Sequence, residues 1–400
     1  MSAVGLQATR DAGRGMLVQL GQRVDLGLLL VVAALLALGL VMVASASIGI
    51  ADRGVGDPFH FLKRQGVYLL AGLAWAYVMF NLRLAWLESA GPWLMLLAFL
   101  LLTLVLVPGI GKTVNGSTRW IALGPVNVQV SELAKLALTV YLAGYLVRHG
   151  QAVRDTFQGF LVPLLMSFIA ALLLLLEPDF GAAAVLMAIT LGVLFLGGVR
   201  LWQFGLLLLV VLGAMAVLAL SSPYRLARLT AFLNPWNDPF NSGFQLTQSL
   251  IAIGSGSWFG VGLGGSVQKL FYLPEAHNDF LFAVLAEELG LIGVTVVIVL
   301  YAFLFWRCFR IGTAAEAVGH RFGAYLSYGL GLWFGLQACI NMGVNMGLLP
   351  TKGLTLPLMS YGGSSMMVSC AAVGLLLRVH RETVSIAGIE RMRHSLAGIR

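Results

Sequence analysis

The chain has 400 residues, of which 59% are hydrophobic and only 10% are charged. A soluble protein of this length would cover its cores with far more charge, so the soluble globular classes are excluded. The net charge of +8 does not indicate nucleic-acid binding, because the basic residues are scattered over loops rather than gathered in one stripe. The composition predicts a polytopic helical membrane protein.

Ten apolar stretches follow one another along the chain, each a predicted transmembrane helix. They cover residues 26–46, 66–82, 93–107, 133–147, 160–176, 181–197, 204–220, 291–305, 325–346 and 354–377. The first stretch is longer than the apolar core of a signal peptide, so we expect it to be retained as a span. The expected fold class is an all-α polytopic integral membrane protein with ten transmembrane helices. Residues 1–23 and 381–400 are then cytoplasmic tails around a membrane domain at 24–380.

The predicted orientation follows from the distribution of Lys and Arg. They are more frequent in the tails and loops that are cytoplasmic if the N-terminus is inside, so both termini are expected in the cytoplasm. Segments 108–130, 221–278 and 347–353 then share the outer face. The second of them is a large extracytoplasmic loop between the seventh and eighth spans. Chemistry on this face takes place away from cytoplasmic ATP.

A rare concentration of polar side chains closes the large loop, in the sequence LPEAHNDF at 273–280. The simplest interpretation is a helix N-cap, for which Asn278 or Asp279 is well suited. If the helix includes both, Asp279 and Glu287 share one face at four-residue steps. A carboxylate at a water–lipid boundary can have a pKa raised toward neutrality, which a general base acting on a sugar hydroxyl requires.

Charged and aromatic residues also lie close to the predicted outer ends of other spans. Glu132 and Lys135 are three residues apart at the start of the fourth span, so they are neighbours on one helix face. They form either a mutually neutralising pair or the charged wall of an outer cavity, with Lys135 available to an anionic ligand. Arg119 and Trp120 are either an interfacial anchor or a phosphate-binding site.

Two further groups have structural and functional interpretations. Glu177 and Asp179 end the fifth span, where turn formation and helix capping are the expected roles. Gln245, Gln248 and Ser249 recur at helical spacing and make one polar face. Such a face would suit either the polar head of a lipid-linked substrate or a partner-binding helix.

The longest ordered motif reads NMGVNMGLLPTKGLTLPLMSYGGSS at 341–365. With LPEAHNDF and SELAK, it resembles the SEDS (shape, elongation, division, sporulation) family along almost the whole chain, including the ten-span layout. The sequences PTKGLTLP, NPW and GFQLTQS are similar to the cell-division branch more than to the elongation branch. Asn278 stands where the family usually has Thr, and Val130 where Pro is commoner.

The resemblance implies polymerisation of peptidoglycan glycan strands from lipid II, and it places the family's essential aspartate at Asp279. The motif residues Glu132, Lys135 and Trp120 carry over in the same way. The candidate substrate-binding residues are Lys135, Glu132, Arg119, Trp120, Arg225, Gln245, Gln248, Lys269, Glu275, His277 and Ser360. Asp279 is either a general base toward the acceptor sugar's 4-hydroxyl or a ligand to a divalent ion, magnesium or manganese, that bridges the pyrophosphate.

The resemblance also implies a place in the cell and a set of partners. We expect a multi-pass protein of the bacterial inner membrane at the division septum. It would act with a cognate class B penicillin-binding protein, a transpeptidase, and with other division proteins. Two alternatives remain: a lipid II flippase, and a scaffold that recruits the transpeptidase.

Overall fold

The computed structural model describes residues 24–114, 117–124, 126–220, 232–241, 243–270, 272–351 and 353–397. Long helices dominate, because most of the chain is apolar and a helix satisfies every backbone hydrogen bond within its own segment. The helices are α2 (Leu26–Val55), α3 (His60–Asn81), α4 (Leu84–Val105), α5 (Val130–Asp155), α6 (Phe157–Leu176), α7 (Phe180–Leu196), α8 (Leu201–Leu220), α10 (Phe244–Gly256), α11 (Leu281–Ala317), α12 (Arg321–Asn345) and α13 (Gly363–Ala397). A short 3-10 turn, η1, covers Pro235–Asn237.

A long helix coincides with each of the ten predicted spans, and among the helices whose bounds the structure describes α10 lies outside them. Within the described residues, six helices are long and apolar enough to cross a membrane: α2, α4, α5, α6, α11 and α13 up to Ile389. The helix α7 is apolar but shorter. These findings support a multi-pass helical membrane protein.

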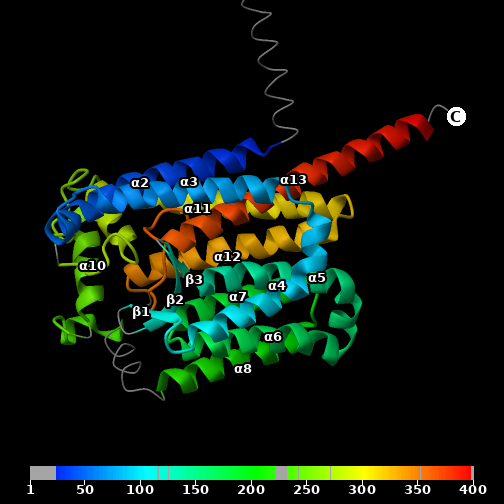
Figure 1. The fold of residues 1–400 in the computed structure, drawn as a ribbon, viewed down its shortest axis with the longest axis horizontal. Helices are drawn as coiled ribbons and strands as arrows, with labels where there is room; N and C mark the ends of the chain where they lie inside the picture. Colours follow the sequence, from blue (N-terminus) through cyan, green and yellow to red (C-terminus); the bar gives the residue numbers. More distant parts are fainter. Residues whose placement is uncertain are drawn as a thin grey trace, which may run out of the picture.

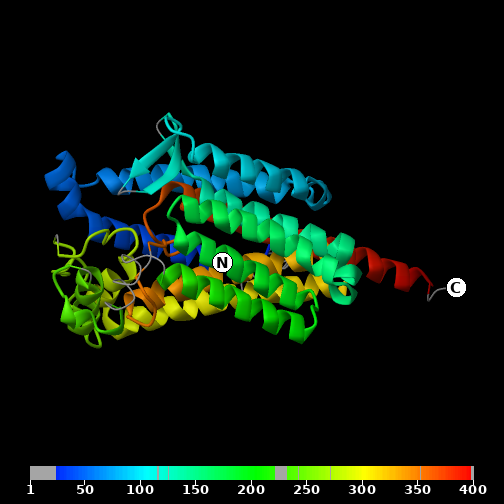
Figure 2. The same cartoon turned by 90° about the horizontal axis from the view of Figure 1, so that it is seen from below.

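The helices form one bundle with two different ends (Figure 1). The small sheet and α10 lie at one end, and the last turns of α13 project from the other. The view turned by 90° shows the same separation (Figure 2). We call these the sheet end and the tail end. A functional site built at the sheet end is therefore remote from the C-terminus.

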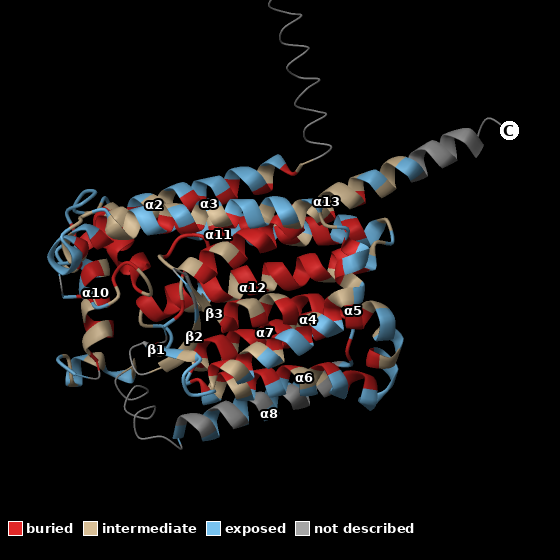
Figure 3. Cartoon of the chain, viewed as in Figure 1, coloured by how far each residue is buried: buried red, intermediate tan, exposed pale blue. Residues whose placement is uncertain are grey.

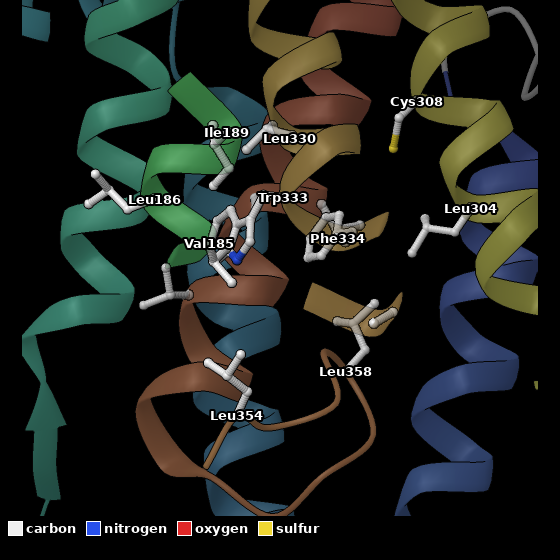
Figure 4. Close-up of a cluster of buried hydrophobic side chains, with 14 of the residues drawn as sticks. Val185, Leu186, Ile189, Leu304, Cys308, Leu330, Trp333, Phe334, Leu354 and Leu358 are labelled. Atoms are coloured by element: carbon white, nitrogen blue, oxygen red, sulfur yellow. The ribbon is translucent and has the colours of Figure 1, made fainter. Parts of the chain in front are cut away.

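Burial is highest in the helices at the centre of the bundle (Figure 3). Trp333 and Phe334 of α12 are 1% and 0% exposed. They lie among Ile189 of α7 and Leu304 and Cys308 of α11 (Figure 4). The outer faces of α3, α4 and α6 are exposed and apolar, as expected of surfaces that contact lipid. The helix α12 is thus the inner element against which the site is built.

The described helices confirm the all-α class of the chain, but segment 108–130 contains a small sheet that was not predicted. Three strands form an antiparallel sheet there in the order β1-β2-β3, with bounds Gly111–Val114, Ser117–Leu123 and Val126–Gln129. Trp120 pairs with Gln129 across the sheet. Thr118, Trp120 and Ile121 are β-branched or aromatic, so this stretch fits a half-buried strand.

The last predicted span begins nine residues too early. Residues 354–362 are not helical, and α13 starts only at Gly363. Leu354, Leu356 and Leu358 are nonetheless buried, so this segment enters the bundle as irregular backbone. It packs closely enough that a Cβ on Gly39 of α2 would lie 2.6 Å from Met359 Cα. The predicted span began too early because hydropathy detects burial but not secondary structure. The buried apolar residues here belong to a loop, and side chains from α12 donate hydrogen bonds to its carbonyls.

Candidate active site

Asp279 lies on a tight turn that ends immediately before α11. Asn278 N–H and Phe280 N–H both donate to the carbonyl of Glu275, at 3.0 and 3.3 Å, and Glu275 has a φ of +55°. Helix α11 begins at Leu281, and no side chain within this turn caps it. The interpretation of Asn278 or Asp279 as the N-cap was therefore wrong, which leaves the Asp279 carboxylate unused by the helix.

Two asparagines of α12 hold the backbone of this turn. Asn341 and Asn345 donate their side-chain amides to the carbonyl of Asp279, at 2.9 and 3.1 Å. The amide oxygen of Asn345 accepts from Ala283 N–H at 3.2 Å, so this residue caps α11 from a neighbouring helix. Both asparagines are buried. The position of Asp279 is therefore set by the packing of α12 against α11.

The backbone of the 353–362 segment crosses directly beside the Asp279 carboxylate. A Cβ placed on Gly353 would lie 2.8 Å from Asp279 Oδ2, which only glycine avoids. The same segment is fastened next to it, because Asn341 also donates to Leu354 O at 2.5 Å and Tyr361 N–H donates to His277 O at 3.0 Å. Two chain segments far apart in sequence thus form the walls around Asp279.

The surroundings of Asp279 favour its neutral form. The residue is half-buried, and burial raises the pKa of its carboxyl to about 7, assisted by Glu275 and Asp179 and opposed by Arg119. Such a group exchanges its proton near neutral pH, which suits general acid–base chemistry. Among the described residues, the Asp279 carboxylate forms no salt bridge.

Arg119 projects from strand β2 onto the turn between α6 and α7. Its guanidinium donates to the carbonyls of Glu177 and Pro178, at 3.4 and 2.5 Å, and lies 3.9 Å from Asp179 Oδ1. Asp179 caps α7 by accepting from Ala182 N–H at 3.1 Å, as its position in the sequence indicated. Arg119 therefore contributes positive charge near Asp279 while it ties the sheet to the bundle.

Glu177 is the unexpected member of this group. It is fully buried, and neither carboxyl oxygen accepts a hydrogen bond in the described part of the chain. Burial, with a smaller contribution from Asp179, raises its pKa to about 8, and Arg119 only partly opposes this. Glu177 is thus a second carboxyl group that titrates near neutrality at the sheet end.

Lys135 and Glu132 form a buried ion pair. Lys135 Nζ lies 2.9 Å from Glu132 Oε1 and 2.6 Å from Gln337 Oε1, and the Lys135 side chain is 0% exposed. Gln337 in turn donates to Thr355 O at 2.9 Å. The two residues therefore neutralise each other and connect α5, through α12, to the segment beside Asp279. Within this arrangement Lys135 is not open to solvent.

Lys269 and the two consecutive glutamates of α11 hold the end of the large loop. Lys269 Nζ lies 2.7 Å from Glu288 Oε1 and 2.9 Å from Ser45 Oγ of α2. Glu287 accepts from Ser266 Oγ at 2.5 Å and Val267 N–H at 3.0 Å. The expectation that Glu287 shares a helix face with Asp279 was wrong, because Asp279 precedes the helix. Glu287 instead holds the loop segment at Ser266 and Val267, which precedes Asp279 in the chain.

The remaining candidates lie at several places. His277 is buried between Phe61 and Tyr361, with ring centroids 4.6 and 5.4 Å away, and burial lowers its pKa although Glu275 opposes this. Ser360 Oγ accepts from Leu356 N–H at 2.9 Å and so shapes the buried loop. Trp120 is half-buried in β2, and Gln245 and Gln248 are half-buried on α10. Arg225 lies outside the described residues.

A divalent ion at Asp279 would need ligands beyond the His, Cys, Asp and Glu side chains that the structure describes. No group of three His, Cys, Asp or Glu side chains capable of holding a metal occurs among the described residues. Asp179, the neighbouring carboxylate, already caps α7 and faces Arg119. The described His, Cys, Asp and Glu side chains therefore form no preassembled metal site of three or more ligands.

Three residues of α12 that organise the site were missed from the sequence. Gln337, Asn341 and Asn345 follow one another at four-residue steps, so they form a polar row on one face of an otherwise apolar helix. Polar side chains inside a membrane helix usually face the bundle interior and bond backbone groups there. That periodicity was the available signal, and the structure shows that the row contacts both walls beside Asp279.

Comparisons with known proteins are consistent with this architecture. The cell cycle protein family of FtsW, RodA and SpoVE matches residues 26–385. The chain is 71% identical to a probable peptidoglycan glycosyltransferase FtsW of Thioalkalivibrio sulfidiphilus, over 96% of each chain. It is 61% identical to the protein of that name from Nitrosococcus halophilus, over 90% of this chain and 92% of that one.

Solved structures show the same fold. A chain from a peptidoglycan synthase complex that coordinates polymerization and crosslinking superposes with a TM-score of 0.74 at 35% identity, covering 90% of this chain and 98% of that one. The rod shape determining protein RodA of Thermus thermophilus superposes with a TM-score of 0.67 at 33% identity, covering 90% and 97%. The chain therefore belongs to the FtsW, RodA and SpoVE family of cell cycle proteins, the SEDS family.

Proposed function

We propose that this chain is a peptidoglycan glycosyltransferase that polymerises lipid II into glycan strands at the division septum, with Asp279 as its catalytic group. The observation that carries the proposal is a half-buried carboxyl group with a pKa of about 7, fixed through its own backbone by two asparagines and left unused by the fold. Membership of the family and the names of its relatives, which describe probable peptidoglycan glycosyltransferases, support the reaction class.

In this reaction Asp279 accepts the proton of the acceptor sugar's 4-hydroxyl. That oxygen forms a bond to the anomeric carbon of the donor, and the bond from this carbon to the polyprenyl diphosphate breaks. The anomeric configuration inverts in such a single displacement. A base with a pKa near the working pH is efficient because it is both available and basic enough.

The departing diphosphate gains negative charge and is stabilised by cations positioned before the reaction. Arg119 is the best candidate, since its charge acts on Asp279 and it lies on the outer sheet. Lys135 and Lys269 are held in ion pairs with Glu132 and Glu288, so their charges are already balanced. Their proposed contribution is to hold the walls of the site.

The proposed topology has ten spans with both termini in the cytoplasm, which puts the sheet end outside. The helices that coincide with all ten predicted spans support it, as does the concentration of arginines in the tails and loops of the tail end. The large loop at 221–278 would then be extracytoplasmic. Asp279 would face the side on which glycan strands are assembled.

We further propose a class B penicillin-binding protein, a transpeptidase, as a partner, together with other division proteins. The similar chain from a synthase complex that couples polymerization to crosslinking supports this. A scaffold role is compatible with it. A flippase is less well supported, because the described ion pairs lie toward the two ends of the bundle and form no polar path between them.

The test is lipid II polymerisation by the purified full-length chain, with and without the transpeptidase. Asp279→Asn should lower the rate by about 10²- to 10⁴-fold, the range of a general base. Asp52→Asn, an exposed carboxylate near the end of α2, is the matched control and should leave the rate unchanged. Normal polymerisation by Asp279→Asn would overturn the assignment.

Divalent ions separate the two roles of Asp279. If the carboxylate is the base, excess magnesium or manganese leaves Asp279→Asn inactive, since no metal replaces the proton acceptor. If it is a metal ligand, excess ion restores a large part of the rate by mass action. Transport of fluorescent lipid II across liposomes that contain only this chain would instead favour the flippase.

A further inference from the structure

A polar cavity of about 830 Å³ lies at the tail end, remote from Asp279. The end of α5 and the connection between α11 and α12 line it. Helix α12 shows the separation: Arg321, its first residue, borders the cavity, whereas Asn345, its last, holds the carbonyl of Asp279. The cavity therefore belongs to neither the proposed reaction nor its walls.

Arginine side chains give this cavity a cationic lining. Arg148, Arg154 and Arg321 face two carboxylates, those of Asp155 and Glu316. Glu316 already accepts a hydrogen bond from the Tyr328 hydroxyl at 2.9 Å. The lining therefore carries more positive than negative charge, and one of the two carboxylates is partly engaged.

The arginines retain most of their hydrogen-bonding capacity. Arg148 donates to Glu88 O at 3.1 Å, and Arg154 donates to Gly197 O at 3.0 Å. The Arg321 side chain makes no hydrogen bond or ion pair with the described residues. Each guanidinium has five N–H donors in a planar fork that matches phosphate oxygens. The cavity is thus equipped for a phosphate group.

Exposed aromatic residues place the cavity at the level of a membrane interface. Trp86 lies in the first turn of α4, two residues before Glu88. Phe157 begins α6, two residues after Asp155, and Trp202 lies in the first turn of α8, near Gly197. These three side chains are 68%, 54% and 62% exposed. Trp and Tyr side chains gather where headgroups meet the hydrocarbon core, because their rings are amphipathic. Basic pockets between membrane helices on the cytoplasmic side bind anionic lipid headgroups.

We propose that this cavity binds the headgroup of an anionic phospholipid of the inner leaflet, with the phosphate on the arginine guanidiniums. The excess of guanidinium groups over carboxylates favours an anionic over a zwitterionic lipid. Arg321 is the lining arginine whose donors have no partner in the part of the chain that the structure describes. The bound lipid would link α5 to the connection between α11 and α12.

The test is native mass spectrometry of the purified full-length chain titrated with phosphatidylglycerol or phosphatidylcholine. Wild type should bind phosphatidylglycerol about tenfold more tightly than phosphatidylcholine. Arg321→Gln should bind phosphatidylglycerol about tenfold more weakly than wild type, as expected for the loss of one charge-assisted pair. Arg321→Lys keeps the positive charge but not the planar guanidinium, so its affinity for phosphatidylglycerol should lie between those of wild type and Arg321→Gln. Arg200→Gln, an exposed arginine at the same end outside the lining, is the matched control and should change affinity less than twofold.

Several outcomes would overturn the proposal. They are equal affinity for the two lipids, an equal loss in Arg200→Gln, or an unchanged affinity in Arg321→Gln. Displacement of the lipid by inorganic phosphate, but not by chloride at the same ionic strength, would assign the cavity to free phosphate instead. Thermal unfolding of each variant controls for folding, and phosphatidylglycerol should raise the unfolding temperature of wild type more than that of Arg321→Gln.

Discussion

Gly353→Ala is the sharpest perturbation of the proposed active site. The new Cβ would lie 2.8 Å from Asp279 Oδ2, whereas ordinary contacts begin at 3.4 Å, so the carboxylate must shift by about 0.6 Å. The displacement falls on the carboxylate itself, because it is the end of a flexible side chain whereas Asn341 and Asn345 hold its backbone. A catalytic group displaced by about 1 Å can cost 10²-fold in rate, so we expect a loss of about ten- to a hundredfold in kcat.

The assay is lipid II polymerisation, with Gly362→Ala as the control. Gly362 lies in the same buried segment, and a Cβ there would meet neighbours only at 3.5 Å, an ordinary contact. Neither glycine has a positive φ, so alanine imposes no backbone strain at either position. Gly362→Ala should keep nearly the wild-type rate, and both variants should keep the wild-type unfolding temperature within a few degrees.

The reasoning would be refuted if Gly353→Ala polymerised lipid II at the rate of wild type. Equal losses in the two alanine variants would also refute it, because they would indicate that the whole segment had moved. A loss confined to KM, with kcat unchanged, would place the effect on substrate binding rather than on the position of the carboxylate.

The pH profile should rise with a midpoint near pH 7, because the pKa of Asp279 is about 7 and only the ionised carboxylate is a base; a flat rate from about pH 5 to 9 would exclude it as the base. Glu275→Gln removes a carboxylate that raises this pKa, so the midpoint should move to lower pH. Arg119→Gln removes the opposing cation, so the midpoint should move to higher pH, and an unchanged midpoint would show that Arg119 does not act on Asp279. Lys135→Met should lower the free energy of unfolding by about 3–5 kcal/mol, because it leaves the buried Glu132 charge unpaired. The double variant Lys135→Met with Glu132→Leu should recover much of this loss. Chemical denaturation measures both free energies.

Much of the fold was predictable because membrane helices are encoded locally. A helix bonds its own backbone, so an apolar run of sufficient length forms one wherever its neighbours lie. The candidate catalytic residue was predictable for a related reason. A carboxylate such as Asp279 is rare in an apolar chain, and the motif around it resembles one family.

The arrangement of the site depends on contacts between distant segments. Asn345 is followed along the chain by the buried loop, yet it bonds the carbonyl of Asp279, 66 residues earlier. The pairing of Lys135 with Gln337 spans 202 residues. The polar row of Gln337, Asn341 and Asn345 signals a buried face of α12, but it does not indicate which distant segments that face contacts.

The sequence by itself determined the class of protein, the helices and the candidate residue Asp279, because hydropathy and motif identity are properties of neighbouring residues. Only the tertiary structure decided that α13 begins at Gly363, that Asp279 lies before α11 rather than within it, and that the backbone at Gly353 closes one wall of the site. Buried loops and helices are equally apolar, so hydropathy cannot separate them. The packing of α11 and α12 does separate buried loops from helices, because it determines which backbone groups form hydrogen bonds outside their own segment.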